Sequence, residues 1–249
     1  QWPYHAVSDV LLAHSLLRSL PEVDADRIGL TGISWGGYLT CVVSGLDDRF
    51  QFAVPVYGCG FLGENSTWKD QLEKMGPAGE RWLALWDPSH YLPRGAMPKL
   101  WVTGTNDFAY PLDSLQKSYR AAGGSSTLAV RLRMPHGHGG AGENPEEIHA
   151  FADSILKGGP PLPRMGRLES KGDRVQASYD SSTPVQKAEL LWTTNLGKWA
   201  ERKWESKVAE IDQAAKLVSA PVPTGARVYF LNLYDDQGRV VSTEHAEIP

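Results

Sequence analysis

The sequence predicts a protein of the α/β class, in which a parallel sheet flanked by helices precedes a small antiparallel β-sandwich. Over residues 1–157, short apolar segments alternate with amphipathic segments of helical period. Such alternation is typical of a parallel sheet with helices on both faces. After a Gly- and Pro-rich linker at 158–165, apolar residues recur with a period of two over 166–249. Period two with polar turns and no helical pattern indicates antiparallel strands.

The first part begins with an amphipathic helix over about residues 4–20, whose apolar residues share one face. The helix expected at about 144–157 opens with Asn-Pro-Glu-Glu, which supplies a cap, a first-turn proline and acidic residues suited to the helix dipole. A polar and aromatic insertion at about 60–95 interrupts the alternation, and we expect it to form a cap. The remaining expected elements are strands at 27–33, 51–57, 98–104 and 128–134 and helices at about 35–46 and 111–122.

The second part is expected to be a sandwich of the immunoglobulin or fibronectin type III kind. Its strands follow one another closely, and the Asp-Asp-Gln-Gly sequence at 235–238 reads as a hairpin turn. A bracing role for this domain is favoured over a carbohydrate-binding role, which stays open.

Composition excludes several classes of function. The 249 residues are 41% hydrophobic and 22% charged with a net charge of −4, which is ordinary for a globular protein. Nothing in this charge distribution predicts nucleic acid or an anionic membrane surface as a partner. No apolar stretch is long enough to span a bilayer. The two cysteines, Cys41 and Cys59, suit buried packing positions, and no spacing predicts a metal site.

The most informative motif is Gly-Ile-Ser-Trp-Gly at 32–36, which lies between an expected strand and an expected helix. A serine on such a tight turn projects its hydroxyl above the sheet, and the glycines permit the strained backbone. The N-terminus of the helix offers unpaired N–H groups to an oxyanion. This context predicts the nucleophile elbow of an α/β-hydrolase, with Ser34 as nucleophile and the N–H of Trp35 as one oxyanion donor.

An acyl-transfer serine also needs a base and a carboxylate, which follow it in this order in such folds. Asp107 comes directly after the strand at 98–104, at the edge where parallel sheets bind ligands. Two histidines follow the last strand, His136 and His138. We expect His138 to be the base because it lies between two glycines, which leave room to turn the imidazole. His136 is the alternative, or a packing residue.

The second oxyanion donor and the substrate contacts are less well defined. No residue matches the usual second donor, and either the side chain of Tyr57 or an amide within 57–60 stays open for this role. Tyr57, Trp68 and Trp86 are candidates for contacting substrate. Packing of the insertion onto the sheet explains each of these aromatic residues equally well.

The elbow, together with Gly-Thr-Asn-Asp at 104–107 and Gly-His-Gly at 137–139, resembles α/β-hydrolases of the acetylxylan esterase, dienelactone hydrolase and prolyl oligopeptidase-like grouping. The resemblance covers about residues 1–157. It implies a serine carboxylesterase without metal or cofactor, in which Ser34 attacks the carbonyl, His138 shuttles the proton and Asp107 orients His138. An acetyl or feruloyl ester of a carbohydrate is the implied substrate. A secreted or periplasmic location is suggested by the same resemblance.

The expected strands match only the second half of the usual sheet, so strand 27–33 would have an open, apolar edge. We therefore hypothesise that a second polypeptide or a swapped copy completes the sheet. Two other functions stay open. One is a serine peptidase of the prolyl oligopeptidase-like kind, although no acidic pair and no propeller are evident. The other is a non-catalytic binding module on a hydrolase scaffold.

Overall fold

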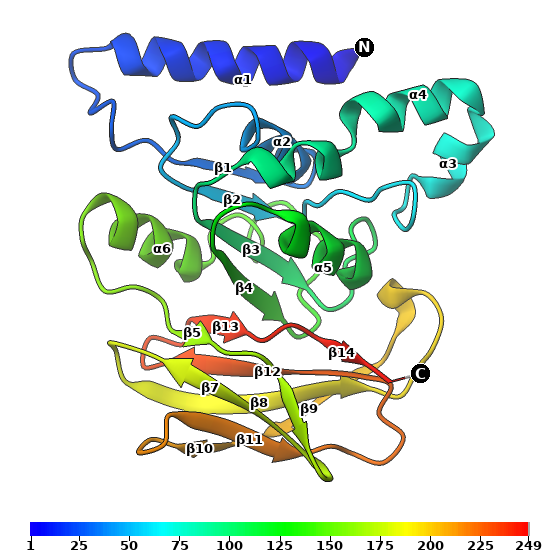
Figure 1. Cartoon of the computed structure of the whole chain (residues 1–249), viewed down its shortest axis with the longest axis vertical. Helices are drawn as coiled ribbons and strands as arrows, with labels where there is room; N and C mark the ends of the chain where they lie inside the picture. The colour runs from blue at the N-terminus through cyan, green and yellow to red at the C-terminus, as the bar shows by residue number, and fades with distance from the viewer. Residues whose placement is uncertain (249) are drawn as a thin grey trace.

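The computed structural model describes residues 1–248 and places a parallel sheet with its helices above two antiparallel sheets (Figure 1). The parallel sheet has four strands in the order β1-β2-β3-β4. The predicted fold class is confirmed. Among the described residues, no helix is long and apolar enough to cross a membrane.

The parallel sheet follows the expected alternation, with strands shorter than the sequence indicated. Strand β4 ends at Arg131 rather than residue 134, because Arg133 adopts a positive φ of 52° and turns the chain away from the sheet. The elements of this part are α1 (Trp2–Ser19), β1 (Leu30–Ile33), α2 (Trp35–Val43), β2 (Ala53–Val56), β3 (Lys99–Gly104), α5 (Leu112–Ala121), β4 (Ser126–Arg131) and α6 (Glu146–Leu156).

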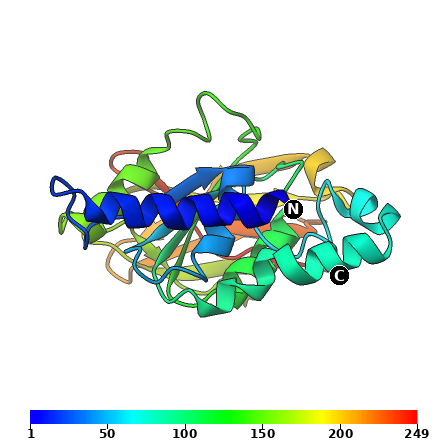
Figure 2. The same ribbon diagram turned by 90° about the horizontal axis from the view of Figure 1, so that it is seen from above.

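The insertion between β2 and β3 is helical. It contains α3 (Lys69–Lys74), α4 (Pro77–Trp86) and the 3₁₀ turns η1 (Pro88–His90) and η2 (Leu92–Arg94). The buried carboxylate of Asp87 accepts hydrogen bonds from the N–H groups of Phe61 at 2.9 Å and Leu62 at 2.8 Å. This carboxylate therefore ties the two ends of the insertion together. Seen from above, α3 and α4 lie at the end of the molecule where α1 begins (Figure 2).

The second part is a sandwich of two antiparallel sheets. One has the strand order β10-β11-β7-β5, with β6 on β7, and the other β13-β12-β8-β9, with β14 on β12. Leu231 and Leu233 of β12 are buried on the face that they share with Tyr229, whose hydroxyl lies 3.3 Å from Ser170 Oγ of the other sheet. Phe230, on the opposite face of β12, lines a small cavity with Leu128 and Val130 of β4. The strands are β5 (Arg164–Met165), β6 (Glu169–Lys171), β7 (Arg174–Asp180), β8 (Val185–Thr193), β9 (Trp204–Val208), β10 (Glu210–Asp212), β11 (Leu217–Pro221), β12 (Val228–Asp235), β13 (Val240–Ser242) and β14 (Ala246–Glu247).

The sandwich contacts the parallel sheet at one end of β4. The N–H of Val130 donates to Ser242 Oγ at 2.9 Å, and the carbonyl of Val130 accepts from Asn232 Nδ2 at 2.9 Å. The buried carboxylate of Glu147 pairs with Arg131 and accepts from the N–H of Val240 at 2.7 Å. Because all these groups are buried or partly buried, the two parts form a fixed interface.

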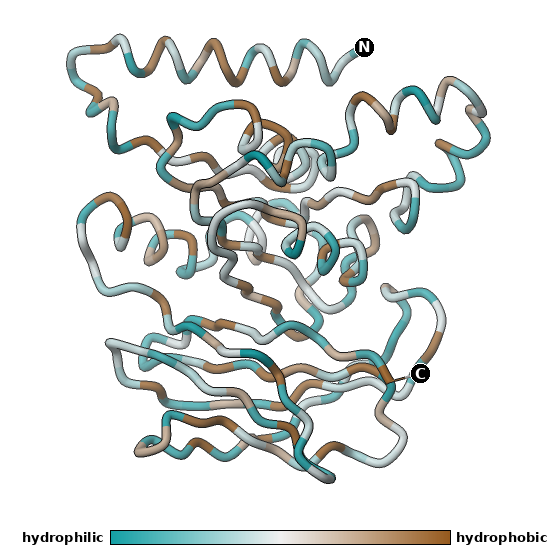
Figure 3. The backbone as a smooth tube through the Cα atoms, in the orientation of Figure 1, coloured by the Kyte–Doolittle hydropathy of each residue, from teal (hydrophilic) through white to brown (hydrophobic). Residues whose placement is uncertain are grey.

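The opposite edge of the sheet is different. Within the described residues, β1 pairs only with β2. Along α1, which lies above this edge, hydrophobic and hydrophilic residues alternate (Figure 3). Several of its apolar side chains are exposed to solvent: Trp2, Tyr4, Leu12, Leu16 and Leu17. An open strand edge beside exposed apolar side chains marks a surface that another segment could cover.

Candidate active site

Ser34 lies on the turn between β1 and α2 in a strained conformation, with φ 58° and ψ −117°. Its N–H donates to the carbonyl of Val56 at 2.9 Å, which anchors the turn to β2. A Cβ added to Gly32 would lie 2.4 Å from the carbonyl oxygen of Gly36, and one added to Gly37 would lie 2.4 Å from the carbonyl oxygen of Val56. The turn is therefore built on close backbone contacts that larger residues would break.

The hydroxyl of Ser34 lies 2.8 Å from Nε2 of His136. Nδ1 of the same ring lies 3.0 Å from both carboxylate oxygens of Asp107. Asp107 is fixed in turn, because its Oδ1 accepts from the N–H groups of Ala109 and Tyr110, each at 2.8 Å. The structure thus brings together a hydroxyl, an imidazole and a buried carboxylate in the arrangement that activates a nucleophile.

The preference for His138 as base is corrected by this geometry. The ring of His138 lies 6.5 Å from that of His136, measured between centroids, and it has no hydrogen bond to Ser34 or Asp107. The physical reason is the early end of β4. Since the chain turns at Arg133, the first histidine of the loop rather than the second reaches the serine.

Tyr57 supports the histidine loop instead of contacting substrate. It is buried, its hydroxyl donates to the carbonyl of Pro135 at 2.6 Å, and its ring stacks on His136 at 4.6 Å. Burial, and secondarily the charge of Asp107, raises the pKa of Tyr57, so the phenol stays protonated and able to donate. Its N–H donates to Val102 at 2.9 Å. The suggestions that Tyr57 binds substrate or an oxyanion are therefore not supported.

An aromatic pocket of about 270 Å³ opens beside Trp35, the residue after Ser34. The ring of Trp35 packs on Trp68 at 4.5 Å and edge-on against Trp2 at 5.1 Å. Trp86 does not line the pocket, and its Nε1 donates to the Gln1 side chain at 2.6 Å. Of the predicted aromatic contacts, only Trp68 is therefore placed there. The pocket is lined by Trp2, Trp35, Leu62, Trp68, Gln71, Leu72, Met75 and Trp82.

Trp35 is the first residue of α2, so its N–H lies in the first turn, where helical N–H groups lack intrahelical partners. The other candidates within 57–60 are partly occupied, because the N–H of Gly60 donates to Ser118 Oγ at 2.8 Å. Within residues 1–248, no group of three or more His, Cys, Asp or Glu side chains is placed to hold a metal ion.

The loop that carries Asp107 is held in part by hydrogen bonds to the sandwich. Asn106 Nδ2 donates to the carbonyls of Ala200 at 3.1 Å and Arg202 at 2.7 Å, both in the sandwich. Thr105 Oγ1 donates to Asn106 Oδ1 at 2.9 Å and accepts from the N–H of Arg133 at 2.9 Å. The loops that carry Asp107 and His136 are thus joined to each other and to the sandwich. The contacts of Asn106 with the sandwich have no local sequence signal, because the partners are nearly a hundred residues apart.

Comparison with known proteins gives a family and a fold. The model of the prolyl oligopeptidase family matches residues 1–156. The structure is similar to an acetyl xylan esterase from Paenibacillus sp. R4, with TM-score 0.53 and 23% identity over 61% of this chain and 52% of that one. The chain therefore spans about half the length of that relative. No curated protein sequence matches the chain significantly.

Two peptidases are also similar. One is a puromycin-hydrolyzing peptidase of Mycobacterium tuberculosis, with TM-score 0.51 and 25% identity over 62% of this chain and 26% of that one. The other is an acylaminoacyl peptidase of Pyrococcus horikoshii, with TM-score 0.50 and 26% identity over 60% of this chain and 28% of that one. The similarity covers only a minor part of each peptidase.

Proposed function

The chain belongs to the prolyl oligopeptidase family, and from this premise we propose that it is a serine hydrolase that cleaves carboxylic esters through an acyl-enzyme on Ser34. The observation that carries the proposal is the position of His136. Its Nε2 lies 2.8 Å from Ser34 Oγ while its Nδ1 faces Asp107 at 3.0 Å. This geometry suits a base that accepts the hydroxyl proton and a carboxylate that fixes its tautomer.

The proposed reaction has two balanced halves. Ser34 Oγ attacks the ester carbonyl carbon while its proton passes to His136 Nε2, and the collapse of the tetrahedral intermediate returns this proton to the departing alcohol. Water then attacks the acyl-enzyme, giving a proton to Nε2, and the collapse releases the carboxylic acid with the proton back on Ser34. Asp107 stabilises the imidazolium in both halves, and the N–H of Trp35 donates to the oxyanion.

The aromatic pocket supports an apolar group on the substrate. It begins at Trp35, next to the nucleophile, and Trp68 forms one of its walls. A flat aromatic acyl group would pack on these rings in an offset or edge-on arrangement. Feruloyl and acetyl esters of carbohydrates remain the proposed substrate class.

A peptidase is the second candidate, because the family and two similar structures are those of peptidases. A p-nitrophenyl ester and a p-nitroanilide with the same acyl group distinguish the candidates. An esterase cleaves the ester with a rate advantage over the anilide that exceeds the difference in intrinsic reactivity of the two reagents, and it leaves the anilide intact. Efficient cleavage of the anilide would assign the chain to the peptidases. If neither reagent reacts, a binding module without catalysis is the better account.

The open edge of β1 supports a further part of the proposal, namely that another polypeptide or a swapped copy adds a strand there. Because Leu30 and Ser34 bond to β2, the main-chain groups of Thr31 and Ile33 face away from it. The added segment would also cover the apolar residues of α1 and supply a second oxyanion donor. Light scattering tests the swapped copy: a dimer whose dissociation abolishes activity supports it, and an active monomer contradicts it.

A further inference from the structure

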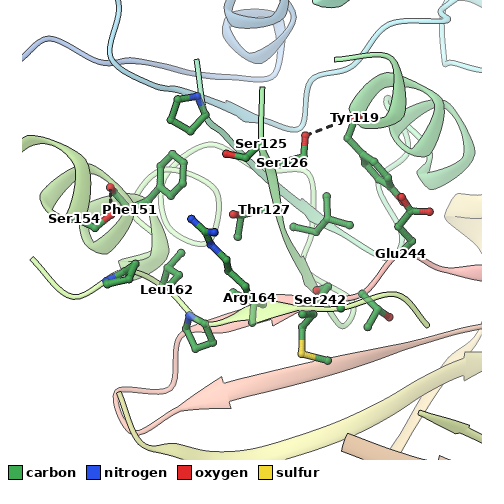
Figure 4. A pocket seen from close by; sticks show the side chains of 18 of the residues that line it. Tyr119, Ser125, Ser126, Thr127, Phe151, Ser154, Leu162, Arg164, Ser242 and Glu244 are labelled. Atoms are coloured by element: carbon green, nitrogen blue, oxygen red, sulfur yellow. Dashed lines mark hydrogen bonds between the residues drawn. The ribbon is translucent and has the colours of Figure 1, made fainter. Parts of the chain in front are cut away.

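A second cavity, of about 670 Å³, lies between the parallel sheet and the sandwich (Figure 4). Its walls come from α6, from the start of β4, from the linker around β5, and from β13 and the segment that follows it. None of its lining residues takes part in the site at Ser34. The reaction proposed above therefore assigns it no role.

One wall is an open strand edge. In β4, the odd-numbered residues bond to β3, as the bonds from Lys99 N–H to Ser125 and from Thr105 N–H to Arg131 show. The main-chain groups of the even-numbered residues face the opposite way. The main-chain N–H and carbonyl of Val130 form hydrogen bonds with Ser242 and Asn232 of the sandwich. Those of Ser126 and Leu128 face the cavity, without a hydrogen bond to any described residue.

The cavity is also lined by guanidinium groups that form no ion pair with any described residue. Arg164 extends from β5 toward Thr127 and Phe151 on the opposite wall (Figure 4), and its guanidinium group has no hydrogen bond or ion pair with any residue of 1–248. Asp180, its partner in the β5–β7 ladder, forms its ion pair with Lys216 at 2.9 Å; this contact and, to a smaller extent, the more distant charge of Arg164 lower the pKa of Asp180. The lining residue Glu244 pairs with an arginine outside the cavity, Arg120.

Arg167 is a second lining cation without an ion pair among the described residues. Around these charges the floor is apolar, with Phe151, Ile155, Leu162 and Met165. The cavity thus combines unpaired main-chain groups, apolar surface and guanidinium groups. An extended peptide that carries both apolar and acidic side chains could interact with all three.

We propose that this cavity is a docking groove for an extended acidic peptide segment, which adds as a strand to the open edge of β4 and pairs a carboxylate with Arg164. Strand addition satisfies the main-chain groups of Ser126 and Leu128, and alternate side chains of the peptide enter the apolar floor. Charge complementarity to Arg164 and Arg167 selects acidic side chains or a terminal carboxylate. An acidic oligosaccharide could pair with the guanidinium groups, but it lacks the regularly spaced N–H and carbonyl groups that pair with a strand edge.

A fluorescein-labelled heptapeptide of alternating valine and glutamate tests the proposal by fluorescence anisotropy with the whole chain. The matched probe has lysine in place of glutamate, and a further pair carries N-methyl groups on the odd or the even amides. Arg164→Ala is expected to weaken binding roughly 5-fold, as loss of one exposed charge pair does. Arg81→Ala is the control, because Arg81 is an exposed cation of α4 outside the cavity.

The expected result is that the glutamate peptide binds, the lysine peptide does not, and at least one N-methylated isomer fails. Equal binding of the two charge variants, an unchanged affinity in Arg164→Ala, or full binding of both methylated isomers would each overturn the proposal. So would binding of tetragalacturonate while the glutamate peptide fails, which would assign the cavity to acidic sugars.

Discussion

The side-chain amide of Asn106 donates to the main-chain carbonyl of Arg202 at 2.7 Å, so the sandwich holds the residue that precedes Asp107. Asn106→Ala removes this bond, the one to Ala200 and the one from Thr105, and it leaves the Asp107 side chain present but less firmly positioned. A small displacement of a catalytic group is costly, and we expect kcat for ester hydrolysis to fall roughly 10- to 100-fold with little change in KM. Steady-state kinetics measure this split.

The control for this prediction is Asn195→Ala. Asn195 is also half-buried, and its side chain accepts a single hydrogen bond, from the N–H of Lys203. Both variants should lose stability in urea, Asn106→Ala more because it loses more hydrogen bonds, but only Asn106→Ala should lose kcat. Equal kcat values in the two variants would show that the contact to Arg202 does not position Asp107.

The choice between the two histidines gives a second prediction. His136→Ala removes the group that contacts Ser34, and we expect kcat to fall by roughly three orders of magnitude or more. His138→Ala should keep kcat within a few-fold of the wild type, since its ring does not reach the serine. Rates of p-nitrophenyl butyrate hydrolysis decide the matter, and the reverse ranking would restore His138 as base.

The aromatic pocket gives a third prediction. Trp68→Ala removes one wall, so the preference for longer acyl chains should weaken. We expect the ratio of kcat/KM for p-nitrophenyl octanoate to that for acetate to fall roughly 10-fold, because about 1.5 kcal/mol of apolar contact is lost. Trp86→Ala should leave the ratio unchanged, since Trp86 lies outside the pocket. If the ratio falls equally in both variants, the pocket does not determine the preference for acyl chain length.

A fourth prediction concerns acid stability. Burial opposes ionisation of Asp47, but hydrogen bonds from Arg49 and His14 outweigh it and hold the pKa well below its usual range. A lowered folded-state pKa contributes stability above the unfolded value of about 3.9, which is lost as the pH falls through the folded value. Wild type should therefore lose roughly 1–3 kcal/mol more than Asp47→Asn between neutral pH and about pH 2.

Urea unfolding of both proteins at the two pH values measures this difference. Asp48→Asn is the control, because Asp48 is an exposed neighbouring carboxylate without an ion pair among the described residues. Parallel loss of stability in wild type and Asp47→Asn would show that the cluster around Asp47 does not govern acid unfolding.

The parts of the molecule that depend on local chain signals could be predicted from the sequence. Ser34 was predictable because the glycines around it serve a turn that is complete within a few residues. The alternation of strands and helices was predictable for the same reason. The helices α3 and α4 were not predicted, because the insertion has no clear helical period and is held by contacts between distant residues, from Asp87 at the end of α4 to Phe61 and Leu62.

The histidine could not be chosen from the sequence, because the choice depends on where β4 ends. The positive φ of Arg133 sets that end, and Arg133 bonds to Thr105 across the sheet and to Trp204 in the sandwich. Contacts between parts so distant in the chain have no local sequence signature. The same holds for Asn106 and for the cavity beside β4.

Covalent labelling by a fluorophosphonate probe tests the central claim most directly, because it requires an activated serine and no particular substrate. We predict rapid labelling of Ser34 in the wild type and in His138→Ala, with none in Ser34→Ala and very slow labelling in His136→Ala. Mass spectrometry of the labelled peptide locates the adduct. A folded wild-type protein that is not labelled, or is labelled equally fast in His136→Ala, would contradict the proposed mechanism.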